Sequence, residues 1–332
     1  MFRPRANVPP SRLAMERASF FASQTERHGS GFRQLGGDAA MPLVKAAILA
    51  SNAHNSQPWL FRILGSCVEL YADRARNIGL VDPYLREMHL SLGCALENLV
   101  IAAARFGHDS AVDVADGVLH LLEEEPKPTR VAAVRLRSGQ CTSSPLYDAI
   151  PNRRTNRTPY DGERPLPSGF ADALLALTAG VAVKTFLFTG VQERERIAEL
   201  TLARPVIYGD RGEEPRGGKD GFLASSGPMF GVIAVRDRYD LAQTLCAGRV
   251  WQRASLLATA WGIASRPDNG AVALIDYERR LQREPKAESS LAELIGDSTW
   301  QPTLIFFMGY AAAAATFSPR RPIADVVSLT RH

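Results

Sequence analysis

Two stretches of this 332-residue chain share a spacing that constrains the whole fold. Residues 93–107 read GCALENLVIAAARFG, and residues 248–262 read GRVWQRASLLATAWG. Each stretch begins and ends with glycine, carries an aromatic residue before the last glycine, and has apolar residues at helical spacing. The offset, 248 minus 93, is 155 residues, close to half of the chain. Chance could produce the glycines, but a shared helix with matched ends favours a chain built from two related lobes.

The elements predicted around these helices fit a mixed helix and sheet plan. A helix over 43–50 leads into the first half, and the long helix there is predicted over 85–106. Strands are predicted over 59–64, 68–71, 131–136 and 303–308. Gly, Thr and Ser cluster near 138–145, which favours a boundary there. We therefore expect an α+β protein with an N-terminal arm (1–38), a first lobe (39–140) and a second lobe (141–332).

Composition excludes several classes of protein. A hydrophobic content of 45% with 22% charged residues is typical of an ordinary globular chain, and no segment approaches the length of a membrane span. The net charge of +4 comes from scattered arginines, which argues against nucleic acid but suits an anionic cofactor. No phosphate loop, dinucleotide fingerprint or metal-binding motif is present. The four cysteines lie far apart and the basic N-terminus lacks an apolar signal core, so we expect a cytoplasmic protein without a metal site.

A polar run interrupts the first lobe between a helix and a strand. Residues 51–59 read SNAHNSQPW, and Pro58 stops this segment from remaining helical. Asn52, Asn55 and Gln57 offer side-chain amides that suit the polar edge of a planar ligand. The alternative is an Asx-type turn that satisfies its own backbone, which is the commoner use of such clusters.

Three arginines surround a hydroxyl just after a short helix predicted over 145–150. Residues 152–157 read NRRTNR, so Arg153, Arg154 and Arg157 lie close to Thr155 along the chain. Guanidinium forks and a hydroxyl match the geometry of a phosphate group better than lysines would. The sequence therefore predicts an anion clamp, with a solvated basic surface as the alternative.

Two further segments of the second half are candidate ligand contacts. Pro267, Asn269 and Gly270 belong to the sequence PDNG directly after the repeated helix, and Gly270 allows a ligand to approach the backbone. A plain β-turn is the alternative. Arg320 and Arg321, which precede a proline near the C-terminus, form the second candidate contact. The alternative is that this segment is only a charged linker.

The polar run carries a family resemblance. NSQPW, residues 55–59, resembles the flavin-contacting segment of the FMN-dependent nitroreductases, a Pro-Ser-x-x-Asn-x-Gln-Pro-Trp stretch that reaches the flavin from the neighbouring subunit. Ser51 and Asn52 depart from it where the family carries Pro and Ser. HNSQPW resembles more closely the two-lobed, Acg-type branch of that family. The resemblance implies a nitroreductase-like α+β fold duplicated in one chain as a pseudo-dimer.

The other motifs resemble parts of the same family site. RRTNR is similar to the family's Arg-Arg-Ser-x-Arg, which implies that Arg153 and Thr155 hold the FMN phosphate and ribityl chain and that Arg157 lies near the pyrimidine edge. PDNG resembles the Pro-x-x-Gly turn whose backbone N–H groups face flavin N5. The C-terminal Arg-Pro resembles an ending in which an arginine before a helix reaches the phosphate, and Arg321 is the expected one. The candidate cofactor-binding residues are Asn52, Asn55, Gln57, Arg153, Arg154, Thr155, Arg157, Pro267, Asn269, Gly270, Arg320 and Arg321.

The resemblance also implies a function. The family takes its site from two subunits, and here the matching motifs fall in opposite lobes, so we expect one FMN per chain in a monomer that acts as a pseudo-dimer. The expected activity is oxidoreductase: NAD(P)H gives hydride to FMN, which reduces an electron-poor small molecule such as a nitroaromatic, a quinone or an unsaturated metabolite. No catalytic side chain is required. The alternative is a protein that binds or sequesters FMN under a lid formed by residues 208–226.

Overall fold

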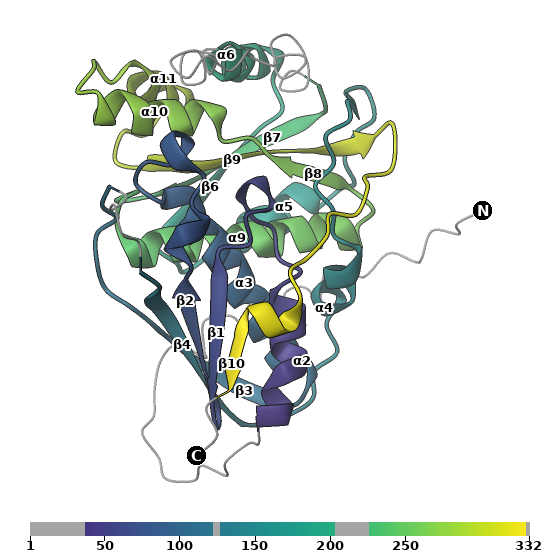
Figure 1. Cartoon of the computed structure of the whole chain (residues 1–332). Coiled ribbons are helices and arrows are strands. Elements are labelled where there is room, and N and C mark those ends of the chain that lie inside the picture. The colour runs from purple at the N-terminus through teal and green to yellow at the C-terminus, as the bar shows by residue number, and fades with distance from the viewer. Residues whose placement is uncertain (1–36, 122–126, 203–225, 330–332) are drawn as a thin grey trace.

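The computed structural model describes residues 37–121, 127–202 and 226–329 (Figure 1). The expected N-terminal arm lies almost entirely outside these residues. So does the loop expected to form a lid, of which only Ser226 is described. No helix of the described residues is long and apolar enough to cross a membrane. Within the described ranges the protein is α+β, as predicted.

The first lobe is a five-stranded sheet packed against helices. Its strand order is β10-β1-β2-β4-β3, and all neighbours are antiparallel except β10 and β1. The predicted strands and the long helix are confirmed to within two residues at each end, whereas the helix predicted over 43–50 begins six residues earlier, at Gly37, and ends three residues earlier, at Ala47. The elements are α2 (Gly37–Ala47), β1 (Trp59–Leu64), β2 (Cys67–Ala72), α3 (Arg86–Arg105), β3 (His108–Val114) and β4 (Thr129–Ser138).

The second lobe has a mainly antiparallel sheet of its own. Its strand order is β5-β9-β7-β6, and β8 also pairs with β9. Strand β9 contains the predicted strand at 303–308 and is the longest of the described strands. The elements are α4 (Pro145–Ala149), β5 (Tyr160–Asp161), α5 (Phe170–Ala176), β6 (Val183–Phe188), α6 (Val191–Leu202), β7 (Met229–Val235), α9 (Leu241–Ala260), β8 (Ala264–Pro267), α10 (Gly270–Arg280), α11 (Lys286–Ile295) and β9 (Gln301–Ala311).

The two repeated helices pack against each other between the sheets. Helices α3 and α9 have 20 residues each, and both ends of α9 lie 155 positions after those of α3 (241 minus 86, 260 minus 105). A Cβ on Gly93 would lie 2.1 Å from the backbone oxygen of Leu245, and a Cβ on Gly248 would lie 2.1 Å from that of Leu90. Since Leu245 also follows Leu90 by 155 residues, the contact is reciprocal. The two glycines are required by this close approach of backbones.

The C-terminal segment crosses from the second lobe to the first (Figure 1). After β9 the chain runs past Arg320 to a single 3₁₀ turn (Ile323–Asp325) and strand β10 (Val327–Leu329), which pairs in parallel with β1. The prediction of a helix after the Arg-Pro sequence is therefore wrong. The open edge of β1 offers backbone groups for pairing, as in the 2.7 Å bond from the Phe61 N–H to the Val326 carbonyl, and buried Val326 suits a strand.

Candidate functional site

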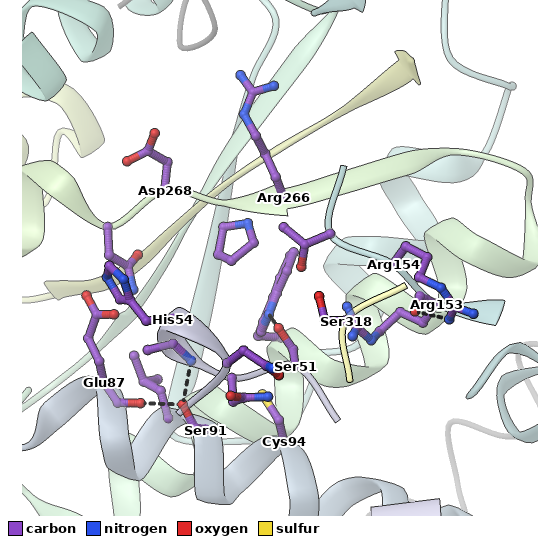
Figure 2. Close-up of a pocket in the computed structure, with 18 of the residues that line it drawn as sticks. Ser51, His54, Glu87, Ser91, Cys94, Arg153, Arg154, Arg266, Asp268 and Ser318 are labelled. Atoms are coloured by element: carbon purple, nitrogen blue, oxygen red, sulfur yellow. Dashed lines mark hydrogen bonds between the residues drawn. The ribbon is translucent and has the colours of Figure 1, made fainter. Parts of the chain in front are cut away.

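A cavity of about 540 Å³ lies between the lobes. Its walls come from the loop after α2, the first half of α3, the segment after α4, the junction of β8 with α10, and the crossing segment 316–320 (Figure 2). Ten of the twelve candidate cofactor residues line it. They are Asn52, Asn55, Arg153, Arg154, Thr155, Arg157, Pro267, Asn269, Gly270 and Arg320. Segments far apart in the sequence therefore meet at one site.

The polar run enters the cavity in an unusual backbone conformation. His54, Asn55 and Gln57 all have φ between 51° and 54°, in the left-handed region that residues other than glycine seldom adopt. The Asn52 side chain accepts the Gln57 N–H at 3.0 Å and donates to the Ala50 carbonyl at 3.2 Å. Asn52 therefore satisfies backbone groups of its own loop, as the turn alternative expects, and also lines the cavity. Its side chain stabilises the loop that presents its neighbours.

The same loop is fixed to both long helices. The backbone N–H of Ser51 donates to Gln252 Oε1 of α9 at 3.1 Å, and Trp251 Nε1 of α9 donates to Ser51 Oγ at 3.1 Å. The backbone N–H of Ala53 donates to Ser91 Oγ of α3 at 3.1 Å. Neither α9 residue is close to this loop in the sequence. The cavity wall is therefore held from both lobes, a prerequisite for holding a ligand in one orientation.

Asn55 and Arg320 bind each other at the cavity rim. Arg320 Nη1 donates to Asn55 Oδ1 at 3.0 Å, and Asn55 Nδ2 donates to the Pro319 carbonyl at 3.0 Å. Arg320 Nε also donates to the carbonyl of Ile48 at 2.9 Å, just beyond α2, where a cation stabilises the unpaired carbonyl groups. Burial lowers the pKa of Arg320, and Arg154 lowers it further. Arg320 thus shapes the wall while adding positive charge to it.

Gln57 and Arg321 do not line the cavity. The buried Gln57 side chain accepts the Arg321 N–H at 2.7 Å. Arg321 Nη1 lies 3.3 Å from Asp73 Oδ2 and forms an ion pair with it. The expectation that Arg321 is the inward arginine therefore needs correction, because its charge is neutralised on the first lobe and Arg320 takes the cavity position.

Arg153 is the most informative residue of the site. Its side chain is 5% exposed, its Nε is buried without a hydrogen-bond partner, and it forms no ion pair within the described part of the chain. Burial lowers its pKa to about 10, and neighbouring Arg320 and Arg154 act in the same direction while Cys94 opposes them. A buried cation beside other cations is unfavourable unless an anion accompanies it. The site is thus suited to an anionic ligand.

The rest of the arginine segment is positioned by β8. Thr155 forms a parallel bridge with Ser265, and the Asn156 N–H donates to the Ser265 carbonyl at 3.1 Å. Arg154 Nη1 donates to the carbonyls of Pro151 and Arg153, at 2.9 and 2.8 Å. Arg157 lines the cavity and is exposed to solvent. The alternative of a solvated basic surface therefore applies to only part of residues 152–157.

The PDNG segment is the start of a helix and not an isolated β-turn. Pro267 ends β8, Asn269 caps α10, and Gly270 is the first residue of α10. Asn269 Oδ1 accepts the Ile305 N–H at 2.9 Å, and the Gly270 N–H donates to Asp268 Oδ1 at 3.2 Å. The amino-terminal end of an 11-residue helix therefore faces the cavity, where its backbone dipoles favour negative charge.

Sequence reasoning missed the cavity residues of the long helices. Glu87, Ser91 and Cys94 lie on α3 and Trp251 on α9, in stretches that the sequence marks only as apolar helix. The spacing of these residues gave no signal, because the packing of α3 against α9 decides which face of each helix borders the cavity. Phe317, in the crossing segment, was missed for the same reason.

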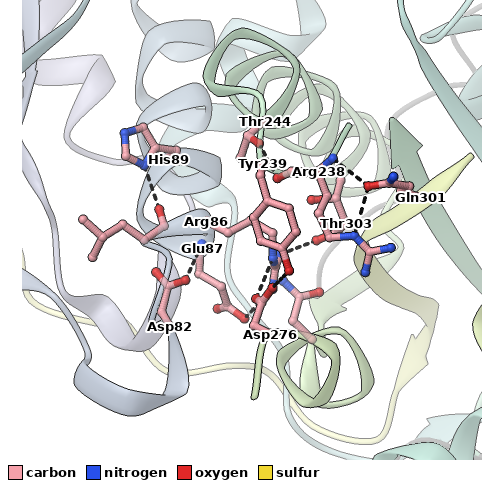
Figure 3. Close-up of polar contacts among 12 residues, drawn as sticks. Asp82, Arg86, Glu87, His89, Arg238, Tyr239, Thr244, Asp276, Gln301 and Thr303 are labelled. Atoms are coloured by element: carbon pink, nitrogen blue, oxygen red, sulfur yellow. Dashed lines mark hydrogen bonds and ion pairs between the residues drawn. The ribbon is translucent and has the colours of Figure 1, made fainter. Parts of the chain in front are cut away.

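A buried polar network joins the lobes next to the cavity (Figure 3). Arg86 of α3 forms an ion pair with Asp276 of α10 at 2.9 Å and donates to the Thr303 carbonyl at 2.6 Å. The Tyr239 hydroxyl donates to Asp276 at 2.8 Å. Asp82 accepts the backbone N–H groups of residues 87 and 88 at 3.0 Å each, and burial, followed by the charge of Glu87, raises its pKa to about 7.

No group of three or more potential metal ligands exists among the described His, Cys, Asp and Glu residues. No family model matches the chain. A provisionally named NAD(P)H nitroreductase, Rv3131 of Mycobacterium tuberculosis, is 33% identical over 128 residues, and its counterpart MT3217 from another strain matches equally. The match covers 37% of this chain and 34% of each relative, so it spans about a third of the relatives' length.

Solved nitroreductases show a weaker likeness. The FMN-bound nitroreductase of Bacteroides fragilis gives a TM-score of 0.43 at 17% identity, over 57% of this chain and 100% of that one. NfnB of Mycobacterium smegmatis in complex with NADPH gives 0.41 at 16% identity, over 56% and 98%.

Proposed function

We propose that this protein is an FMN-dependent oxidoreductase of nitroreductase type, in which NAD(P)H reduces FMN and FMN reduces an electron-poor small molecule. The observation that carries the proposal is Arg153, a buried cation without a counter-charge among the described residues, on the wall of a cavity bordered by the predicted flavin motifs. The NAD(P)H nitroreductase name of the partial relatives agrees with it.

The residues present fit FMN. Ligand cavities commonly measure about 300–1,000 Å³, and this one measures about 540 Å³. Arg153 and Thr155 would hold the phosphate and ribityl chain, with Arg154 and Arg320 adding positive charge. A phosphate would supply the anion that buried Arg153 needs.

FMN, when bound, supplies the hydride chemistry, and the chain supplies orientation and electrostatics. Arg157 would place positive charge beside the pyrimidine edge of the ring, where negative charge grows on reduction. Asn269 and Gly270 at the start of α10 would direct helix-end dipoles towards flavin N5. Asn55, fixed by Arg320, would contribute a polar edge from the first lobe. No side-chain acid or base is assigned.

The pseudo-dimer architecture belongs to this proposal. The matched ends of α3 and α9 and their reciprocal glycine contact support two lobes related by duplication. The coil between β4 and α4 supports a boundary near residue 140. We propose lobes at 39–140 and 141–332 after an arm at 1–38, with the C-terminal strand returning to the first lobe and one FMN held between lobes by a monomer.

Reconstitution and reduction test the proposal in two steps. Purified protein should bind FMN, and Arg153→Ala should weaken that binding by roughly 2–3 kcal/mol, as expected for a buried charge-assisted contact. Arg105→Ala, which changes an exposed arginine outside the cavity, is the matched control. Protein that remains colourless after incubation with FMN would contradict the cofactor assignment.

Anaerobic addition of NADH or NADPH should then bleach the bound flavin within a stopped-flow experiment. A flavin that stays oxidised with both donors would favour the alternative, a protein that sequesters FMN. That alternative rests on residues 208–226, and nothing in the described residues favours it over turnover.

A further inference from the structure

One aromatic side chain at the cavity is open to solvent. Phe317 is 60% exposed and lines the cavity. Of the large hydrophobic residues that are exposed within the described ranges, no other lines it. Trp251, the other large aromatic residue of the wall, is buried and donates to Ser51. An exposed aromatic ring at a cavity has a surface available for stacking.

The ring is held in place by a neighbouring guanidinium and by the residues that follow it in the chain. The Arg154 guanidinium lies over it, with Cζ 4.9 Å from the ring centroid, and Arg154 is itself fixed by two backbone carbonyls. The next residues are anchored as well, since the Ser318 carbonyl accepts from Arg320 at 3.0 Å and the Pro319 carbonyl accepts from Asn55 at 3.0 Å. Binding to a ring already fixed in this way loses little side-chain entropy.

Cations accompany the ring. Arg154 is partly exposed and Arg157 is exposed, and both line the same cavity as Phe317. A flat apolar surface beside the Arg154 guanidinium matches a purine base that carries phosphates, because stacking serves the base and N–H donors serve the phosphates.

We propose that Phe317, with Arg154, binds the adenosine diphosphate part of the pyridine dinucleotide that reduces the flavin. Phe317 stacks on the adenine, and the N–H groups of Arg154 that point away from its backbone partners pair with the phosphates. Phe317 is therefore a binding residue that raises affinity for the whole dinucleotide and leaves hydride transfer itself unchanged. This inference rests on the proposed function, since it assumes that NADH or NADPH is the donor.

The test compares two hydride donors on the FMN-loaded protein. NADPH or NADH carries the adenosine diphosphate part, whereas 1-benzyl-1,4-dihydronicotinamide has the same reacting ring without it. For Phe317→Ala, the dinucleotide concentration that gives half-maximal bleaching should rise about tenfold, within the range of stacking contributions. The maximal bleaching rate, the FMN affinity and the kinetics with the benzyl donor should not change. Phe317→Trp should restore the wild-type concentration dependence.

Phe106→Ala is the matched control, because Phe106 is also exposed but lies outside the cavity, against Tyr147. Free adenosine diphosphate should compete with the dinucleotide in the wild type and about tenfold less well in Phe317→Ala. Equal changes for both donors, or no change for either, would overturn the proposal while the flavin assignment stands. Failure of the wild type to be bleached by either dinucleotide would instead contradict the proposed function, and this inference with it.

Discussion

Two neighbouring contacts in the middle of α3 and α9 use different chemistry. In the first contact, Gln252 Nε2 donates to Asn98 Oδ1 at 2.8 Å, and this amide pair also holds the cavity loop through Ser51. Moving each residue by the 155-residue offset gives Glu97 and Arg253, which form an ion pair at 2.5 Å. The same offset relates Cys94, on the cavity wall, to the buried Arg249, which also pairs with Glu97 at 2.7 Å.

This difference fits a cavity beside the first contact. Cys94 is a small, neutral side chain on the cavity wall, where Arg153 has no counter-charge among the described residues. Arg249, which the 155-residue offset relates to Cys94, already has its charge neutralised by Glu97. The first contact therefore lies beside a wall suited to an anion, and the second contact contains its own anion.

The largest expected effect comes from removing the charge of Glu97. Glu97→Gln removes the carboxylate that pairs with buried Arg249 and partly buried Arg253, which should lower the free energy of unfolding by about 3–5 kcal/mol. Chemical denaturation monitored by circular dichroism measures this. The triple change Glu97→Gln, Arg249→Cys, Arg253→Asn copies the residues of the first contact and should recover at least half of the loss. A triple variant less stable than Glu97→Gln would show that the two contacts are not interchangeable.

The helix crossing should respond equally from both sides. Gly93→Ala and Gly248→Ala each place a Cβ 2.1 Å from a backbone oxygen of the other helix, so the helices must separate. Each change should lower the free energy of unfolding by about 2–3 kcal/mol, typical of overpacking. Ala104→Gly, at a partly exposed position of α3, is the control for helix propensity with little change in packing. Losses that differ by more than twofold between the two glycines would contradict the reciprocal contact.

The buried charge of Arg153 should behave in the opposite way to that of Glu97. Without ligand, Arg153→Met removes a buried cation that has no counter-charge among the described residues and should raise the free energy of unfolding by about 1–2 kcal/mol. The same variant should lose the stabilisation that FMN gives to the wild type, measured as the shift in Tm on adding FMN. Destabilisation of the ligand-free protein by Arg153→Met would mean that Arg153 has a structural partner, and the comparison between the cavity wall and the Glu97 contact would fail.

The smallest expected effect is on acid sensitivity. Burial raises the pKa of Glu97, but Arg253 and Arg249 more than offset this, so its pKa lies below the ordinary value of 4.5. A carboxyl group with a lowered pKa contributes stability above that ordinary value and loses it as pH falls through the lowered one. Glu97→Gln should therefore remove part of the stability loss seen below pH 4.5. Parallel pH profiles for the two proteins would contradict the lowered pKa.

The sequence predicted structure reliably where the conformation of a segment depends on the residues of that segment alone. The strand at 59–64 was predicted with its observed bounds, and the turn chemistry of Asn52 follows from its own neighbours. The arginine segment that lines the cavity was also visible, because three arginines and a hydroxyl in six residues are unusual. The sequence did not reveal which of Arg320 and Arg321 faces the cavity, because this depends on where the first lobe places Asp73 and Asn55. The spacing of residues 318–325 carries no information about those two partners. The burial of Arg153, without a partner among the described residues, likewise depends on the tertiary structure.

Strand β10 was missed for a related reason. Three residues pair with a strand more than 260 positions earlier, as in the register of Phe61 with Val327, and so short a segment has no periodicity to detect. Likewise, Phe317 has the appearance of an ordinary linker residue until the crossing segment is placed beside Arg154.

The crossing segment also limits how a ligand can come and go. It begins at β9 of one lobe and ends in the sheet of the other, with Arg320 and Arg321 fastening it on the way. The Arg86–Asp276 ion pair joins the lobes near the same cavity. Opening the lobes like a hinge would break a strand pairing, several charge-assisted hydrogen bonds and a buried ion pair together. We therefore expect a ligand to enter and leave the cavity past Phe317 while the lobes stay together. Motion of the side chains at this rim should then set the rate of exchange.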